Sequence, residues 1–358
     1  MKAHDPIRSK PRLLQIMLST QPGGAETFFE KLCFGFAEAG VPQCVVIEPN
    51  PEREALFADF PGVEVYPISF GGIQGFFGKR RLRTVFEQFQ PDVALTWMNR
   101  ASRRVPSGYC PVVGRLGGYY GLKYYKNCDH LVGITPDLVE HIKTGGRSTS
   151  DVSLIPNFGE VSGRVADPSE VRRAMRAELG LSDQQTVLLA LGRLHEVKAH
   201  DTLIRALARM DSAVLLLAGE GPLEGELRAL AESLNVYSRV HFLGWRRDIE
   251  ALFATCDISV FPSRYEPNGT VVMESWAQQR PLVASCAKGP EWLVDDGVNG
   301  LLFEIDSVDG LVACVEQVRT DSEFAQKLVV NGELKFRQGF TRECIVEQYL
   351  KLFAELIG

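Results

Sequence analysis

The chain has 358 residues, of which 45 % are hydrophobic and 23 % are charged, and its formal net charge at pH 7 is −6. The length predicts two domains rather than one small module, and the near-average composition excludes a largely disordered chain. Even the mildly basic first half is too weakly charged to present the cationic surface that duplex nucleic acid requires, so we expect no nucleic-acid partner.

Short apolar or β-branched runs alternate with longer segments of helical period in the first half of the chain. This alternation is typical of βα units that build a parallel sheet covered on both faces. We therefore predict an α/β fold with one doubly wound sheet in this half. The expected strands are Leu13–Leu18, Cys44–Ile47, Val63–Ile68, Val93–Trp97, Val112–Gly114, Leu131–Thr135 and Val152–Ile155.

The second half repeats the same alternation and predicts a second doubly wound sheet. Turn-forming residues without periodicity follow Pro156, so we place the linker there and expect domains 1–160 and 161–340. The last segment, 341–358, has a helical period, and we expect it to pack back on the first domain. The expected strands are Val187–Gly192, Val214–Ala218, Val240–Leu243, Ile258–Phe261, Leu282–Ser285 and Leu301–Phe303.

The strongest candidate site follows the predicted strand Ile258–Phe261. Glu266 lies in the loop after this strand, and Glu274 lies about one turn into the next helix. Doubly wound sheets bind ligands at this strand end, where helix-start amides attract anions and carboxylates accept hydrogen bonds from sugar hydroxyls. The motif suits a phosphorylated sugar, and the alternative is a pair of ordinary surface carboxylates. Three residues stand where the helix begins: Asn268, Gly269 and Thr270.

Two basic residues, Arg193 and Lys198, follow the predicted strand Val187–Gly192. A guanidinium fork and a lysine point charge at a strand end can neutralise a diphosphate that leaves with negative charge. The alternative interpretation is a surface loop with ordinary basic residues.

Glycine-containing loops follow three other predicted strands. Gly23 and Gly24 open a helix after the first strand and either let a ligand approach the backbone or form a tight strand-to-helix turn without a ligand. This loop lacks the third glycine of G-x-G-x-x-G and the Lys-Ser/Thr of a P-loop, which disfavours NAD binding and ATP hydrolysis. Glu220 lies in the second loop, and Trp245 and Arg246 in the third. These two loops either border a nucleobase or are tight turns only.

Several motifs are absent from the sequence, and their absence limits the possible reaction types and cellular locations. The chain contains no D-x-D pair, so we expect no metal, and it lacks a G-x-S-x-G elbow, which disfavours hydrolase chemistry. The eight cysteines show no C-x-x-C pair, which predicts a reducing compartment without structural zinc. No secretory leader or run of 18 apolar residues occurs. We therefore expect a cytoplasmic chain that does not span a membrane.

Taken together, the motifs resemble family 4 of the retaining glycosyltransferases. The resemblance implies the GT-B architecture, in which two Rossmann-like domains face a cleft, the second domain holds most of the nucleotide sugar and the first holds the acceptor. It also implies retention by front-face attack, in which the leaving phosphate takes the acceptor proton. The motifs that carry it are G-G-A-E at 23–26, G-R-x4-K at 192–198, G-E-G-P at 219–222, F-L-G-W at 242–245 and E-P-N-G-T-x3-E at 266–274.

The resemblance assigns expected roles to individual residues. Arg193 and Lys198 would hold the donor diphosphate, Glu266 the transferred sugar and Glu274 the ribose. Relatives often carry a histidine where this chain has 115–120, and the resemblance leaves Arg115 or Tyr119 to substitute on the acceptor side. The further donor-binding residues implied are Gly23, Gly24, Glu220, Trp245, Arg246, Asn268, Gly269 and Thr270.

We therefore expect a metal-independent, retaining hexosyltransferase that needs no cofactor beyond its donor. The donor is a nucleotide-diphosphate sugar, with a UDP-sugar favoured, and the acceptor is a glycan or a lipid-linked glycan. The resemblance points to bacterial surface polysaccharide or lipopolysaccharide synthesis. Two alternatives remain open: a GT-B nucleotide-sugar epimerase and a catalytically silent nucleotide-sugar binding protein.

A basic cluster in the first half is a candidate contact with an anionic membrane on its inner face. Apolar residues recur at helical spacing among its first four members, as in helices that rest on lipid. In the alternative interpretation the apolar residues pack into the domain core and the charges are solvated. The cluster comprises Lys79, Arg80, Arg81, Arg83, Arg100, Arg103 and Arg104, and the apolar residues are Leu82, Val85, Phe86 and Phe89.

Overall fold

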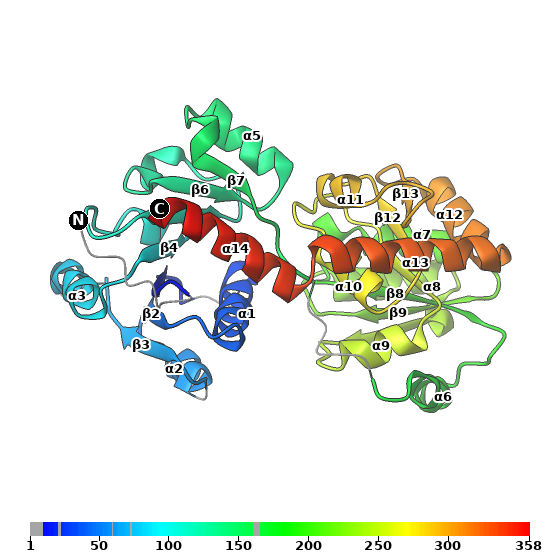
Figure 1. Ribbon diagram of the computed structural model, residues 1–358. Coiled ribbons are helices and arrows are strands. Elements are labelled where there is room, and N and C mark those ends of the chain that lie inside the picture. The colour runs from blue at the N-terminus through cyan, green and yellow to red at the C-terminus, as the bar shows by residue number, and fades with distance from the viewer. Residues whose placement is uncertain (1–9, 21–22, 59, 72–73, 160–164) are drawn as a thin grey trace. The chain divides into compact units, whose positions relative to one another are not determined.

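The computed structural model describes residues 10–20, 23–58, 60–71, 74–159 and 165–358 (Figure 1). The chain divides into two compact units. The first unit comprises Met1–Asn157 with Arg342–Gly358, and the second comprises Phe158–Thr341. Residue 160, where the sequence placed the domain boundary, lies outside the described residues.

The first unit contains a seven-stranded parallel sheet of order β3-β2-β1-β4-β5-β6-β7. Its strands are β1 (Leu13–Met17), β2 (Gln43–Ile47), β3 (Val63–Pro67), β4 (Val93–Trp97), β5 (Val112–Leu116), β6 (His130–Gly133) and β7 (Val152–Leu154). Its helices are α1 (Gly24–Glu38), α2 (Pro51–Ala58), α3 (Gln74–Phe89), α4 (Met98–Ser102), η1 (Leu122–Tyr125), α5 (Pro136–Thr144), η2 (Thr149–Asp151) and α14 (Arg342–Ile357).

The second unit contains a six-stranded parallel sheet of order β10-β9-β8-β11-β12-β13. Its strands are β8 (Thr186–Leu191), β9 (Ala213–Ala218), β10 (Val240–Gly244), β11 (Ile258–Phe261), β12 (Leu282–Ser285) and β13 (Leu301–Phe303). Its helices are α6 (Pro168–Glu178), η3 (Glu196–Lys198), α7 (His200–Leu207), α8 (Glu224–Ser233), η4 (Tyr237–Arg239), α9 (Ile249–Thr255), α10 (Thr270–Ala277), α11 (Lys288–Leu293), α12 (Val308–Thr320) and α13 (Ser322–Gly339).

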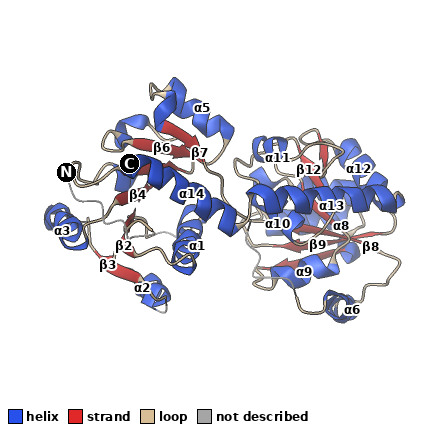
Figure 2. Cartoon of the chain, in the orientation of Figure 1, coloured by secondary structure: helices blue, strands red, loops and turns tan. Residues whose placement is uncertain are grey.

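Strand β8 shows why the strands read as continuous apolar runs rather than as alternating ones. Leu188 packs in the core that contains Leu203 of α7, whereas its neighbours Val187 and Leu189 pack in the core that contains Phe253 of α9. Successive side chains of a strand point to opposite faces, so both faces of this sheet are buried under helices. The core that contains Leu188 also contains Leu227 of α8 and Leu311 of α12, and Figure 2 shows α9 beside the strands of this sheet. The predicted α/β class with two doubly wound sheets is confirmed.

The terminal helix α14 belongs to the first unit, where it packs against α1. The ring centroid of Phe36 lies 5.9 Å from that of Tyr349 and 6.0 Å from that of Phe353. Arg342 forms an ion pair with Glu38 at 2.6 Å. A Cβ atom at Gly35 would lie 3.0 Å from atoms of Arg342, so a glycine here lets the two helices approach closely.

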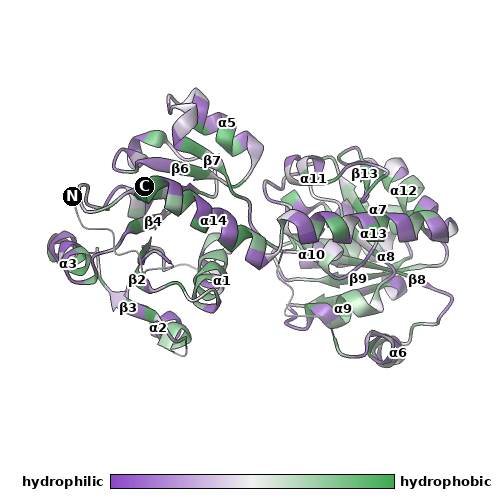
Figure 3. Cartoon of the chain, viewed as in Figure 1, coloured by the Kyte–Doolittle hydropathy of each residue, from purple (hydrophilic) through white to green (hydrophobic). Residues whose placement is uncertain are grey.

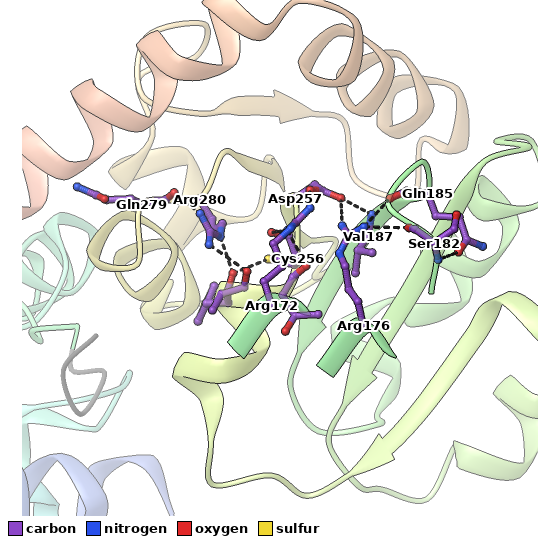
Figure 4. A network of polar contacts seen from close by, with 12 residues as sticks. Arg172, Arg176, Ser182, Gln185, Val187, Cys256, Asp257, Gln279 and Arg280 are labelled. Atoms are coloured by element: carbon purple, nitrogen blue, oxygen red, sulfur yellow. Dashed lines mark hydrogen bonds and ion pairs between the residues drawn. The ribbon is translucent and has the colours of Figure 1, made fainter. Parts of the chain in front are cut away.

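Helix α6 is tied to the second sheet through one carboxylate, Asp257 (Figure 4). Arg172 and Arg176 contact its two oxygens at 2.5 and 2.8 Å, and the second oxygen also accepts the amide of Val187 at 2.7 Å. The side chain of Arg176 is only 3 % exposed, so its charge depends on this partner. Asp257 thus fixes α6 where β11 begins.

Helix α3 carries both hydrophilic and hydrophobic residues (Figure 3). Four of its apolar side chains, Leu82, Val85, Phe86 and Phe89, are buried in the core of the first unit, while Phe77 is exposed. For these four residues the structure supports the alternative interpretation, packing into the domain core, because their side chains fill space beneath the sheet. Within the described residues, no helix combines the length and apolar character that crossing a bilayer demands.

Each sheet has a point where the chain reverses the direction in which strands are added. In the first unit this point lies between β1 and β4, and in the second it lies between β8 and β11. Loops leave such a pair of strands in opposite directions and open a crevice at their carboxyl ends, where doubly wound sheets bind ligands. The functional site is therefore expected in the loops that border these two crevices.

Candidate active site

An ion pair bridges the switch point of the second sheet. Lys198 ends η3 after β8, Glu266 lies in the loop after β11, and the Lys198 Nζ atom lies 2.5 Å from Glu266 Oε2. The side chains are 20 % and 13 % exposed, so the pair is shielded but accessible. The sequence predicted both residues at strand ends, and the sheet order brings them together.

The second oxygen of Glu266 faces the start of α10. It accepts hydrogen bonds from the amides of Asn268 at 3.1 Å and Gly269 at 3.2 Å. These amides precede the helix, where the macrodipole favours negative charge. Asn268 Oδ1 is buried without a hydrogen-bond partner among the described residues, so it is free to accept from a sugar hydroxyl. Glu274 is half-buried further along α10.

The loops after β8, β9 and β10 interlock through their backbones. The Leu194 amide donates to the Glu220 carbonyl at 2.9 Å, and the Gly219 amide donates to the Gly244 carbonyl at 2.8 Å. The Glu220 side chain accepts the amide of Trp245 at 3.3 Å. Glu220 therefore links the loops on both sides of it through its backbone carbonyl and one side-chain oxygen.

Gly219 is required by this interlocking. Its φ of +150° is one that side chains rarely adopt, and a Cβ atom there would lie 1.9 Å from the carbonyl oxygen of Gly192. The close approach of the two loops leaves Arg193 exposed at the strand end. Among the described residues the Arg193 guanidinium has no hydrogen-bond or ion-pair partner. It is thus available to an anion beside Lys198.

The remaining predicted donor residues of this unit lie at the outer part of the same edge. The Trp245 side chain is 61 % exposed, with Arg247 5.1 Å from its ring centroid. Arg246 forms an ion pair with Asp248 at 2.5 Å, which reduces its availability to a ligand.

Two residues that sequence reasoning did not select lie beside the site. Arg264 contacts Asp201 at 2.8 Å and Asp306 at 2.8 Å, and its amide donates to the Val197 carbonyl, so the β11 loop is fixed to η3. His200 is buried beside Lys198, and burial, followed by the Lys198 charge, lowers its pKa to about 4. Arg264 lies 63 residues from Asp201 and 42 residues from Asp306 in the sequence, so no local pattern reveals these contacts.

The predicted first-unit residues divide into exposed and buried ones. Gly23 and Gly24 are exposed where α1 begins, and Tyr119 is 45 % exposed. Arg115 is 2 % exposed, and its guanidinium lies 4.5 Å from the Trp97 ring centroid and donates to Asn157. Arg115 is therefore part of the core of the first unit, because its position on β5 directs the side chain inward.

A histidine does lie beside the acceptor-side loop, although the sequence places it elsewhere. His141 on α5 packs edge-on against Tyr119 with ring centroids 5.4 Å apart, and its Nε2 atom is 3.1 Å from the Tyr120 carbonyl oxygen. The separation along the chain hid this neighbour. Across the described ranges, no group of three or more His, Cys, Asp or Glu side chains is placed to hold a metal ion.

Comparison with known proteins shows the family to which the chain belongs. Residues 171–335 match the family model of glycosyl transferases group 1. The chain is 32 % identical over 334 residues to the lipopolysaccharide core biosynthesis glycosyltransferase LpsE of Rhizobium meliloti, covering 93 % of this chain and 96 % of LpsE. The chain belongs to this glycosyltransferase family. LpsD of the same organism is 32 % identical over 346 residues, covering 96 % of this chain and 98 % of LpsD.

Solved structures agree on the fold of this glycosyltransferase. Anabaena Alr3699/HepE in complex with UDP-glucose matches with a TM-score of 0.79 at 21 % identity, covering 97 % of this chain and 100 % of that chain. WaaG, a glycosyltransferase involved in lipopolysaccharide biosynthesis, matches with a TM-score of 0.67 at 17 % identity, covering 96 % and 99 %. The predicted GT-B class is confirmed, and neither the epimerase nor the silent binding protein is supported.

Proposed function

We propose that this glycosyltransferase moves a sugar from a nucleotide-diphosphate sugar, with UDP favoured as the nucleotide, to a glycan or lipid-linked acceptor of lipopolysaccharide core synthesis. The observation that carries the donor side is the convergence of an unpaired Arg193, Lys198 and Glu266 at the switch point of the second sheet. The names of LpsE and LpsD support the pathway, and the UDP complexes of HepE support the nucleotide.

The site residues divide the donor between them. Arg193 and Lys198 face the diphosphate, which gains charge as the sugar leaves, so their stabilisation grows in the transition state. Loss of either is expected to raise the barrier by about 2.7 to 4 kcal/mol, as loss of one oxyanion donor does. Asn268, Gly269 and Thr270 surround the phosphate and the sugar, Glu266 binds the sugar hydroxyls, and Glu274 binds the ribose.

We propose that the reaction retains the anomeric configuration by front-face attack and needs no metal. In this mechanism the departing phosphate oxygen accepts the acceptor's proton, so no enzyme nucleophile is required. The positive charges of Arg193 and Lys198, with the start of α10, supply the electrostatic stabilisation that a divalent cation supplies elsewhere. Gly23, Gly24, Glu220, Trp245 and Arg246 are proposed as the outer donor contacts.

Product analysis tests this proposal. Purified protein is incubated with UDP-sugars and an extract of truncated lipopolysaccharide core, and the new linkage is assigned by NMR. We expect UDP release that depends on the acceptor and a product with the donor's anomeric configuration. Lys198→Ala should slow release by about a hundredfold to a thousandfold, whereas Arg205→Gln, at an exposed position of α7, should not. An inverted product refutes retention, and the absence of transfer from every UDP-sugar refutes the donor class.

We also propose that the protein acts in the cytoplasm and docks reversibly on the anionic inner membrane through Lys79, Arg80, Arg81 and Arg83 of α3. All four are exposed, and each basic residue near an anionic leaflet contributes about 1 kcal/mol. Since the apolar face of α3 is buried, docking would rest on charge and weaken with salt. Cosedimentation with phosphatidylglycerol vesicles tests it: unchanged binding after all four residues become glutamine removes the proposal.

A further inference from the structure

The switch point of the first sheet carries a second charged site, which contains no residue of the donor-binding set. Arg100 on α4 follows β4, and its guanidinium donates to the Leu18 carbonyl after β1 at 2.9 Å and to Glu48 after β2 at 2.6 Å. One arginine thus spans three strand ends. The switch point of a doubly wound sheet is its ligand-binding edge, so the position itself indicates a site.

Two further arginines stand beside Arg100 without an acidic partner. Arg103 is exposed and its guanidinium carbon lies 5.9 Å from the Tyr124 ring centroid, while Arg104 is half-buried and lies 5.5 Å from the Phe70 ring centroid. Neither forms an ion pair with a carboxylate in the described part of the chain. Glu48, already paired with Arg100, leaves the group with excess positive charge.

These arginines line a cavity of about 260 Å³ together with Asn99 and Tyr124. A water molecule occupies about 30 Å³ in the liquid, so the space admits a group much larger than one water. Guanidinium forks, an amide and a phenol ring are the side chains that bind oxyanions and the sugars attached to them. The lining residues come from α4, from the turn that follows it, and from η1 after β5.

The backbone beside this cavity is strained, and the positive charges that line it repel one another. Met98, between β4 and α4, has a φ of +62°, a conformation that costs energy in a residue other than glycine and that collects at functional sites. Partial burial, followed by the charges of Arg100 and Arg103, lowers the pKa of Arg104. The Glu48 carboxylate offsets only part of this repulsion, and an anion in the cavity offsets more of it.

We propose that this cavity binds an anionic group, a phosphate or a carboxylate, carried by the sugar acceptor. The inference rests on the proposed function, because it names the acceptor class for the unit that does not hold the donor diphosphate. Such a cavity favours acceptors that carry a negative charge close to the reacting hydroxyl. A lipid headgroup is the less suitable occupant, because the cavity has room for a single group. The basic residues on the exposed side of α3 are better suited to contact a lipid surface.

Calorimetric binding of simple charged sugars tests the inference directly. The probes are glucose 6-phosphate, glucuronic acid and uncharged glucose, titrated into the full chain with and without UDP at about 100 times its dissociation constant. UDP fills the donor site, so it prevents the sugar phosphate from binding at Arg193 and Lys198. We expect both charged sugars to bind at least tenfold more tightly than glucose in the presence of UDP.

Two double variants locate the binding. Arg103→Gln with Arg104→Gln should weaken the charged sugars at least tenfold and leave UDP binding unchanged. The matched control, Lys126→Gln with Lys351→Gln, removes the same charge from exposed positions of the same unit that do not line the cavity, and should bind like the wild type. Retained UDP binding also shows that the variants fold.

Each other outcome overturns a specific statement. Equal binding of glucose and the charged sugars, no binding of any probe, or equal affinity in both double variants refutes the anionic subsite. If the Arg103 and Arg104 variant loses binding only to phosphatidylglycerol vesicles, the cavity serves a lipid surface and the inference is wrong. If UDP does not bind but the binding of charged sugars still requires Arg103 and Arg104, the proposal of a UDP-sugar donor is refuted and the proposal of an anionic subsite is supported.

Discussion

The Nζ atom of Lys198 lies 2.5 Å from Glu266 Oε2, while Glu266 Oε1 accepts the amides of Asn268 and Gly269. The Glu266 carboxylate therefore contacts both Lys198 and the amides at the start of α10, which are the groups that would bind the phosphates of the proposed donor. A diphosphate that binds Lys198 has to displace Glu266 or share its partners. The carboxylate is then released toward the sugar, which links donor binding to the position of Glu266.

Substituting the two motif glutamates separates their roles. Glu266→Gln removes the anion that competes for Lys198, so UDP affinity should rise while kcat falls on the order of a hundredfold. Glu274→Gln should weaken UDP and raise KM, with a smaller effect on kcat, because the ribose does not react. Steady-state kinetics and UDP calorimetry on both variants measure this. Equal losses in kcat with unchanged KM contradict the assignment.

Removal of divalent metal tests the electrostatic part of the proposal. We expect full transferase activity in excess EDTA, since Arg193, Lys198 and the start of α10 supply the positive potential. Initial rates with EDTA, and with EDTA followed by manganese, provide the comparison. An activity that disappears with the chelator and returns with manganese would show that this potential is insufficient.

A glycine substitution tests the interlocked loops. Gly219→Ala places a Cβ atom 1.9 Å from the Gly192 carbonyl oxygen at a positive φ, so we expect a loss of stability of more than about 1 kcal/mol and weaker UDP binding. Gly225→Ala on α8 meets no atom within 4 Å and should stabilise the helix by about 0.5 to 1 kcal/mol. Opposite shifts in Tm are the expected result, and a neutral Gly219→Ala would contradict the packing.

Acid stability reports on His200. Its folded pKa of about 4 lies below the unfolded value of about 6.5, so the unfolded chain binds more protons between these pH values. The free energy of unfolding should therefore fall as pH falls through this range, by up to about 3 kcal/mol from this group. His200→Phe removes the ionisable ring. Denaturant titrations from pH 7 to pH 4 should show a smaller loss for the variant, and identical slopes would oppose a buried neutral His200.

The sequence predicted every strand of both sheets in the right place, because parallel strands buried on both faces leave continuous apolar runs between helical segments. It also predicted that Lys198 and Glu266 stand at strand ends. It did not predict their contact, which depends on β8 and β11 being neighbours in the sheet. A sheet order places residues far apart in sequence side by side without any local pattern.

Burial was the harder property to predict. The resemblance left Arg115 to substitute for a histidine on the acceptor side, but the core of the first unit encloses it between aromatic rings. The basic and apolar residues of α3 were compatible with either a membrane or a domain core, since both need an amphipathic helix. Only the packing of Leu82 and Phe86 beneath the sheet distinguishes them.

Nucleotide binding to single-site variants tests the central claim, that Arg193 and Lys198 hold the donor diphosphate, most directly. UDP at about 100 times its dissociation constant should stabilise the wild type by about 2.7 kcal/mol, seen as a rise in Tm, with GDP and ADP compared in parallel. Arg193→Gln and Lys198→Gln should each lose most of this rise, and Arg205→Gln should keep it. A rise that is unchanged in both site variants, or that none of the three nucleotides produces, would contradict the claim.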